Sequence, residues 1–192
     1  MTTLYADRHR AGVPATALAV GFAGAIALRV ALAGTAGATS LRAGLAFAAV
    51  LALFAVVSRP ATRVDVRALS VGVAGAVVLV LPVLLSRGLS DVRPAGGYAG
   101  WAIATALVAS AEEAFLRGAL FDALDRWKGP DLAVAGGAVA FALLHVPLYG
   151  WHVLPLDLAV GVVLGALRLV AGSWTAPAVA HVGADLAGWW LL

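Results

Sequence analysis

The chain has 192 residues, of which 62% are hydrophobic and only 12% are charged, and its mean hydropathy is +0.98. A soluble domain is about 45–50% apolar and about 25% charged, so this composition excludes an ordinary soluble protein and predicts a single-domain, polytopic helical membrane protein. The net charge is +3 and there is no cysteine, which excludes disulfides, thiolate metal sites and a cysteine nucleophile.

Seven apolar segments follow one another along the chain, and most approach the ~20 residues that cross a bilayer as a helix. Turn residues and charges separate them, and period-two alternation is absent, so a β-barrel is not expected. The first segment is too long for the core of a signal peptide and is expected to remain as a helix. The sequence predicts an all-α bundle of about seven transmembrane spans, at about 13–34, 41–58, 68–86, 98–122, 131–147, 153–171 and 174–192.

Lysine and arginine are divided unevenly between the two sides of such a bundle. Cytoplasmic segments are enriched in these residues, so the N-terminus is expected in the cytoplasm and the C-terminus outside. Because orientation accounts for the basic residues, no nucleic-acid partner is expected. With this orientation the inner residues are Arg8, Arg10, Arg59, Arg63, Arg67, Arg126, Lys128 and Arg168, and the outer ones are Arg42, Arg87 and Arg93.

Two adjacent glutamates interrupt the fourth apolar segment. Glu112 and Glu113 lie between apolar runs, and Arg117 follows one helical turn later. A charge at the centre of a spanning helix costs about 2.5–3.5 kcal/mol on insertion scales. Glu113 and Arg117 share a helix face and can pair, whereas Glu112 is rotated by about 100° and can face a cavity.

Further polar groups lie on later spans, again at helical spacing. Phe141 and His145 are four residues apart in the fifth segment, and His181 and Asp185 are four apart in the last. Polar side chains inside a membrane face one another or water rather than lipid. We therefore expect these groups to meet the glutamates at one water-filled site among tilted helices.

Two chemistries fit this set of side chains. In the first, Glu112 and His145 activate a water that attacks a peptide carbonyl, and His181 with Asp185 stabilises the oxyanion or orients its neighbours. In the second, Glu112, His145 and His181 bind Zn²⁺, which activates a bound water. The chain has no H-E-x-x-H motif, and these ligands serve either scheme, so both remain open.

Each signal also has a purely structural explanation. A Glu–Arg pair at this spacing can simply fix helix packing, a histidine near a helix end is often interfacial, and Phe141 alone would be core. Arg29, in the first segment, is expected to snorkel, and Asp157 is expected at an interface. The charged residues of 122–128 are expected to form a solvated helix end. The ordered combination on successive helices favours a functional site.

Three motifs stand in order along these spans. Glu112-Glu113-Ala-Phe-Leu-Arg117 matches E-E-x-x-x-R, Phe141-Ala-Leu-Leu-His145 matches F-x-x-x-H, and His181-Val-Gly-Ala-Asp185 matches H-x-x-x-N/D. This set resembles the CPBP family of intramembrane proteases, the CAAX-protease and bacteriocin-processing group that is also called Abi. The resemblance covers about residues 98–192.

The resemblance implies a role for each matched residue. Many members have Asn where this chain has Asp185, and an ionised Asp cannot donate a hydrogen bond to an oxyanion. Asp185 is therefore protonated, orients His181, or binds a metal. Members are described both as glutamate peptidases and as metalloproteases, so the cofactor is either none or Zn²⁺. The implied roles are water activation by Glu112 and His145, orientation by Glu113 and Arg117, oxyanion support by His181 and Asp185, and support of the substrate cavity by Phe141.

These features predict one integral membrane domain, 1–192, with three N-terminal spans in 1–97 and a four-helix catalytic core in 98–192. The expected function is an intramembrane endopeptidase that acts among lipids on a membrane-associated protein or peptide. A non-catalytic immunity or binding protein on the same scaffold is the first alternative. A proton-coupled transporter is the second, although the paired repeats common in transporters are not visible. The Ala- and Arg-rich composition favours a bacterial cell membrane.

Overall fold

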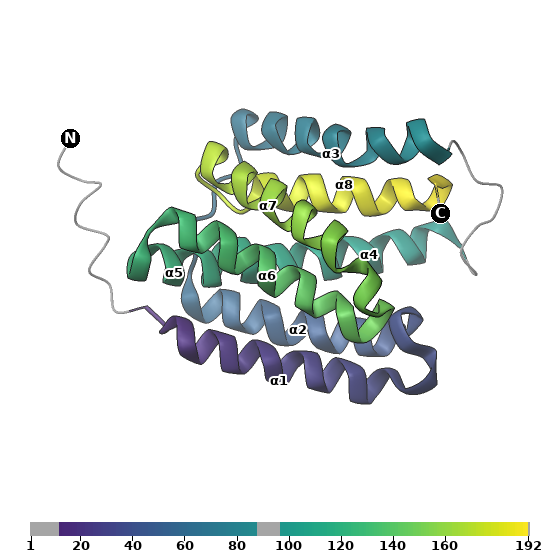
Figure 1. The fold of residues 1–192 in the computed structure, drawn as a ribbon, viewed down its shortest axis with the longest axis horizontal. Helices are drawn as coiled ribbons and strands as arrows, with labels where there is room; N and C mark the ends of the chain where they lie inside the picture. The colour runs from purple at the N-terminus through teal and green to yellow at the C-terminus, as the bar shows by residue number, and fades with distance from the viewer. Residues whose placement is uncertain (1–11, 88–96, 192) are drawn as a thin grey trace.

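The computed structural model describes residues 12–87 and 97–191, and within them every regular element is a helix. The long helices run back and forth along one direction, so that their connections gather at the two ends (Figure 1). The predicted all-α bundle is confirmed. Its elements are α1 (Ala15–Ala33), α2 (Leu41–Ser58), α3 (Val66–Arg87), α4 (Tyr98–Glu113), α5 (Phe121–Lys128), α6 (Pro130–Tyr149), α7 (Leu154–Ala171) and α8 (Thr175–Leu191).

The described part of the chain contains six helices that are long and apolar enough to cross a membrane. One of them is continuous from α4 through a π-helical segment, η3 (Ala114–Leu120), to the end of α5. The last helix, α8, has 17 residues, which is at the lower end of the range that spans a bilayer. Arg8, Arg10 and Arg93, used above to predict orientation, lie outside the described residues.

Glycines end several helices where the sequence predicts breaks. Gly34, Gly129, Gly150 and Gly172 follow α1, α5, α6 and α7, and each has a positive φ, between 53° and 92°. Such a backbone costs little without a Cβ and stops a helix cleanly. The fifth predicted span is longer than expected, because α6 continues past Pro147 to Tyr149.

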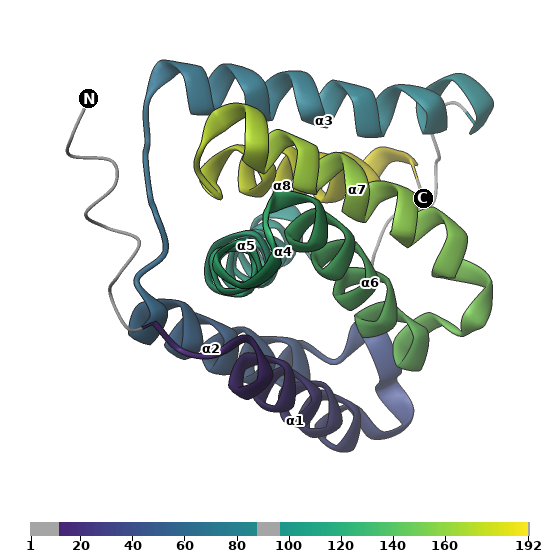
Figure 2. The ribbon, with the colours of Figure 1, turned by 60° about the vertical axis from the view of Figure 1, so that its left-hand side comes forward.

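The rod formed by α4, η3 and α5 lies at the centre of the bundle (Figure 2). It contacts α2 on one side, α8 on another and α6 on a third, whereas α3 is outermost and packs on α8. Aromatic side chains join the α1–α2 hairpin to η3: the Phe115 ring stacks on Phe22 at 5.1 Å and meets Phe54 at 5.9 Å. The central rod is thus shielded by helices from both halves of the chain.

Candidate active site

The glutamate pair lies at the junction between α4 and η3. In η3 the backbone N–H of Phe121 donates to the carbonyl of Leu116, five residues earlier. Arg168 of α7 supports this segment from outside: its Nε donates to the Arg117 carbonyl at 2.9 Å and its Nη2 to Asp122 at 2.8 Å. Short π-helical segments within α-helices occur frequently at functional sites. Asp122 is therefore held by an ion pair, and is not part of a freely solvated helix end as expected.

Glu113 is the centre of a buried network. Its Oε1 accepts a hydrogen bond from Nη1 of Arg117 at 2.8 Å and lies 2.9 Å from Nδ1 of His181. The second arm of the guanidinium, Nη2, donates to the Gly161 carbonyl on α7 at 3.1 Å. Glu113 is 0% exposed and Arg117 1%. The predicted pair between neighbouring turns is present, and it brings α4, α7 and α8 together.

Glu112 points to a different partner. Its Oε1 accepts a hydrogen bond from Nη1 of Arg29 at 3.2 Å, and the residue is 3% exposed. The guanidinium of Arg29 also lies over the Phe47 ring, 4.9 Å from its centre. Arg29 therefore reaches into the bundle rather than snorkelling out of it. Within residues 12–87 and 97–191, no hydrogen bond joins Glu112 to His145 or His181.

His145 lies at the outer edge of this cluster, near the end of α6. Its Nδ1 lies 2.9 Å from the Phe141 carbonyl and 3.7 Å from Oδ2 of Asp157. A carbonyl only accepts hydrogen bonds, so Nδ1 carries a proton and donates to the Phe141 carbonyl. Asp157 belongs to the surroundings of His145, which the expectation of a plain interfacial residue did not include.

Phe141 lies between the two histidines. Its ring meets His145 edge-on at 4.7 Å and His181 edge-on at 5.3 Å, and the Arg117 guanidinium lies over it at 4.9 Å. It is buried. Phe141 therefore fixes the spacing of the imidazoles around the ion pair, which is a packing role inside the predicted site.

The motif of His181 and Asp185 connects the buried network to the exposed edge of the cluster. Nε2 of His181 lies 3.5 Å from Oδ2 of Asp185, while Nδ1 of the same ring meets Glu113. An imidazole protonated on both nitrogens donates to both carboxylates. The Asp185 side chain is 42% exposed, against 8% for His181, so this end of the cluster is the accessible one.

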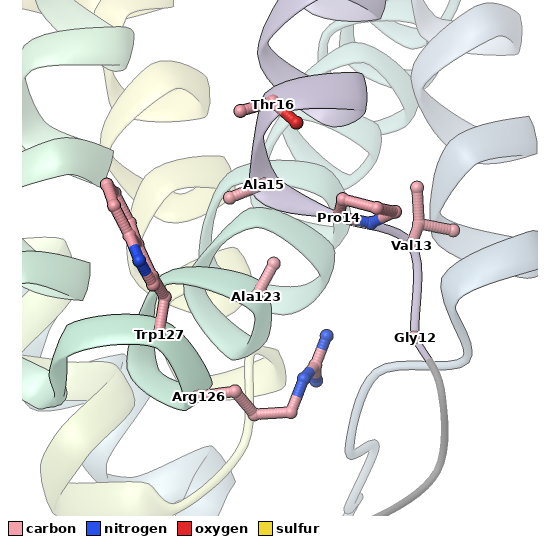
Figure 3. Close-up of a pocket in the computed structure, with 8 residues that line it drawn as sticks. All are labelled: Gly12, Val13, Pro14, Ala15, Thr16, Ala123, Arg126 and Trp127. Atoms are coloured by element: carbon pink, nitrogen blue, oxygen red, sulfur yellow. The ribbon is translucent and has the colours of Figure 1, made fainter.

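The expected water-filled site is more tightly packed than the sequence suggested. Glu112, Glu113, Arg117 and His181 are all buried. A hollow of about 310 Å³ lies elsewhere, between the start of α1 and the end of α5 (Figure 3). None of the predicted site residues lines it; it is bounded by Gly12, Val13, Pro14, Ala15, Thr16, Ala123, Arg126 and Trp127.

A metal ion in a protein is held by several His, Cys, Asp or Glu side chains that lie close together. Among the described residues, no group of three or more His, Cys, Asp or Glu side chains is arranged to hold one. Glu112, His145 and His181 do not form such a set here.

A comparison with protein-family models matches residues 94–187 to the family described as type II CAAX prenyl endopeptidase Rce1-like. The matched segment contains all three motifs and every predicted site residue. Over these 94 residues, the chain is similar to the Rce1-like family. Searches of curated proteins and of solved structures each found no match. The six apolar helices, together with the match to the Rce1-like family, indicate an integral membrane protein.

The Rce1-like motifs do not include several residues that contact the site. Arg29 lies outside the matched segment, yet an ionisable residue within a predicted span is by default a functional candidate. Tyr149 continues the four-residue spacing of Phe141 and His145, and its ring stacks on His145 at 5.8 Å. Arg168 gave no such signal, because its role depends on a backbone carbonyl of η3.

Proposed function

We propose that this chain is an intramembrane endopeptidase that hydrolyses a peptide bond of a membrane-associated protein or peptide. The observation that carries the proposal is the set of buried groups Glu112, Glu113, Arg117 and His181 in the segment that matches the Rce1-like family, with Arg29 of α1 paired to Glu112. Such groups are costly inside a membrane and are usually retained for function. The three motifs supply a candidate base, orienting groups and an oxyanion-facing edge in one place.

In the proposed reaction, Glu112 acts as the general base together with His145. As the water oxygen bonds to the carbonyl carbon, a water proton passes to the Glu112 carboxylate. The C–N bond then breaks, the proton returns to the departing amine, and the other fragment leaves as a carboxylic acid. Glu112 and His145 share no hydrogen bond in the resting enzyme, but catalytic contacts often form only when substrate is bound.

The remaining residues hold this geometry. Glu113 and Arg117 form a fixed pair that positions the junction between α4 and η3, and Phe141 sets the distance between the imidazoles. In the resting enzyme Nε2 of His181 faces Asp185; when substrate binds, this N–H donates to the developing oxyanion instead, while Nδ1 stays held by Glu113. Asp185 orients His181 from the accessible edge, a role that does not require it to donate.

The substrate class follows from the setting and from the name of the matched family. A cluster within a membrane bundle is reached by chains that are themselves anchored in or on the bilayer. The family description names a CAAX prenyl endopeptidase, so a prenylated C-terminal peptide is the first substrate to examine, and a bacteriocin-like peptide is the second. The proposed location is a bacterial cell membrane with the N-terminus in the cytoplasm.

The proposal is tested with purified protein in lipid nanodiscs. Three peptides are compared by mass spectrometry: a farnesylated CAAX peptide, the same peptide without the lipid, and an unrelated transmembrane peptide. Wild type is expected to release a defined C-terminal fragment from at least one of them, and Glu112→Gln and His145→Ala are expected to release none. Arg42→Gln, an exposed charge at the start of α2, is the matched control and is expected to behave as wild type.

Two results would overturn the proposal. Identical products from wild type and Glu112→Gln would place any cleavage elsewhere. Saturable binding of a peptide without cleavage would favour the non-catalytic binding protein on this scaffold.

A further inference from the structure

Helix α1 contributes a positive charge, that of Arg29, to the proposed active site. Within the network, both terminal nitrogens of Arg117 are engaged, Nη1 with Glu113 and Nη2 with the Gly161 carbonyl. A buried carboxylate without a countercharge is strongly disfavoured. Charge compensation for Glu112 comes from Arg29 of α1, whose side chain is 11% exposed.

The position of Arg29 is itself fixed by packing. Its guanidinium lies over the Phe47 ring of α2, a cation–π contact that restricts where the side chain can point. The hairpin that carries both residues is anchored to η3 through the stacked rings of Phe22 and Phe115. The guanidinium therefore approaches Glu112 from a direction that the fold determines.

We propose that Arg29 is a positioning residue for the reaction proposed above. By donating to Oε1, it holds the Glu112 carboxylate turned so that Oε2 faces the reacting water. The inference rests on the proposed function, but it adds a residue that lies outside the matched segment, 94–187. It makes the α1–α2 hairpin part of the catalytic apparatus rather than a membrane anchor.

A purely structural role predicts something different. If Arg29 only balances charge during folding, then every variant that folds should cleave substrate at the wild-type rate. If Arg29 positions the base, turnover should fall in folded protein while substrate binding is retained, and a lysine should restore part of it. The purely structural role and the positioning role of Arg29 therefore predict different values of kcat.

The experiment compares Arg29→Gln, Arg29→Lys and the exposed control Arg42→Gln in nanodiscs, with thermal unfolding recorded for each. Arg29→Gln is expected to lose about 10- to 100-fold in kcat with KM unchanged, because misplacement of a reacting group costs on this scale. Arg29→Lys is expected to regain part of the loss, and Arg42→Gln to match wild type. A folded Arg29→Gln that turns over at the wild-type rate overturns the inference.

A second measurement does not depend on activity. The chain has no cysteine, so Arg29→Cys/Glu112→Cys can be treated with a short bifunctional thiol reagent in membranes. A crosslink between the first and fourth predicted spans is expected in this variant, and the absence of that crosslink overturns the contact between Arg29 and Glu112. Arg42→Cys/Glu112→Cys is the negative control. Wild-type protein that cleaves no peptide, even though the double-cysteine variant crosslinks, overturns the proposed function and the role of Arg29, whereas an active wild type with a fully active Arg29→Gln overturns the inference alone.

Discussion

Two neighbouring glutamates occupy different surroundings, and this difference divides their proposed roles. Glu113 shares one oxygen between Arg117 and His181 and has no exposed surface. Glu112 is held through one oxygen by Arg29. Residues of the same type acquire separate roles when their partners differ. We therefore assign support of the site to Glu113 and proton transfer to Glu112.

Removal of the Glu113 charge should destabilise the protein more than removal of an exposed charge. Glu113→Gln leaves the Arg117 guanidinium buried with a neutral neighbour, and breaking one side of a buried pair costs about 3–5 kcal/mol. Thermal unfolding in detergent should show a clearly lowered midpoint, with Asp131→Asn, at the start of α6, as the control. Equal midpoints for Glu113→Gln and wild type would contradict a buried ion pair.

The exposed end of the network should tolerate substitution. Asp185 interacts with His181 across a distance of 3.5 Å at a partly exposed position, where such a contact contributes about 1 kcal/mol or less. Asp185→Asn should therefore retain most of kcat/KM, whereas His181→Ala should lose nearly all of it. A loss in Asp185→Asn as large as that in His181→Ala would show that the carboxylate itself takes part in the reaction.

Pairs along one helix could be predicted at the residue scale, whereas pairs between helices could not. The spacing of Glu113 and Arg117 determines that they share a face, and the structure contains that pair. The contact of Arg29 with Glu112 depends on the offset of α1 against α4. Apolar sequence patterns do not specify such offsets, because lipid-facing and helix-facing positions are equally hydrophobic.

At the scale of elements, small residues allow the helices to bring backbone groups into the site. A Cβ added at Gly161 would lie 2.7 Å from the Cα of Ala138, so α6 and α7 touch at this point. The same glycine offers its carbonyl to Arg117. Gly161 thus allows α6 and α7 to pack closely and also helps to place the Arg117 guanidinium.

Gly161→Ala should therefore separate α7 from α6 and weaken the bond to Arg117. Overpacking of this kind costs about 1–3 kcal/mol, which thermal unfolding can detect. Gly24→Ala is the matched control, since a Cβ there meets nothing within 4 Å. It should be neutral or stabilising through helix propensity. A similar effect of both substitutions would contradict the close approach of the two helices.

Helix ends were more predictable than the irregular segment within the central rod. The sequence placed breaks at Gly34 and Gly172, where the structure has positive φ. It did not indicate η3, because a π-helical segment is stabilised by partners distant in sequence, among them Arg168. The candidate site residues Glu112 and Glu113 adjoin this irregular element.

At the scale of the whole molecule, the two parts of the chain form one bundle around the central rod. The sequence predicts three N-terminal spans in 1–97 and a four-helix catalytic core in 98–192, which holds every candidate site residue. The α1–α2 hairpin covers Phe115 and pairs with Glu112. The first half of the chain thus contributes contacts to the proposed site.

This arrangement predicts that the C-terminal part depends on the rest. Residues 98–192 expressed alone should be degraded rapidly by protease in detergent, because the α1–α2 hairpin no longer covers Phe115 and Glu112. Co-expression with residues 1–97 should restore protection and copurification. A fragment 98–192 that resists protease alone would show that the core folds independently.

The central claim is that Glu112 activates the water that cleaves the substrate. The most direct test is cleavage of the best peptide in ¹⁸O-labelled water by wild type and by Glu112→Gln, with both proteins shown to fold. We predict that wild type incorporates one ¹⁸O into the new carboxyl group and that Glu112→Gln is slower by about 10²–10⁴-fold, the usual contribution of a general base. Equal rates of formation of labelled product by the two proteins would exclude Glu112 as the general base.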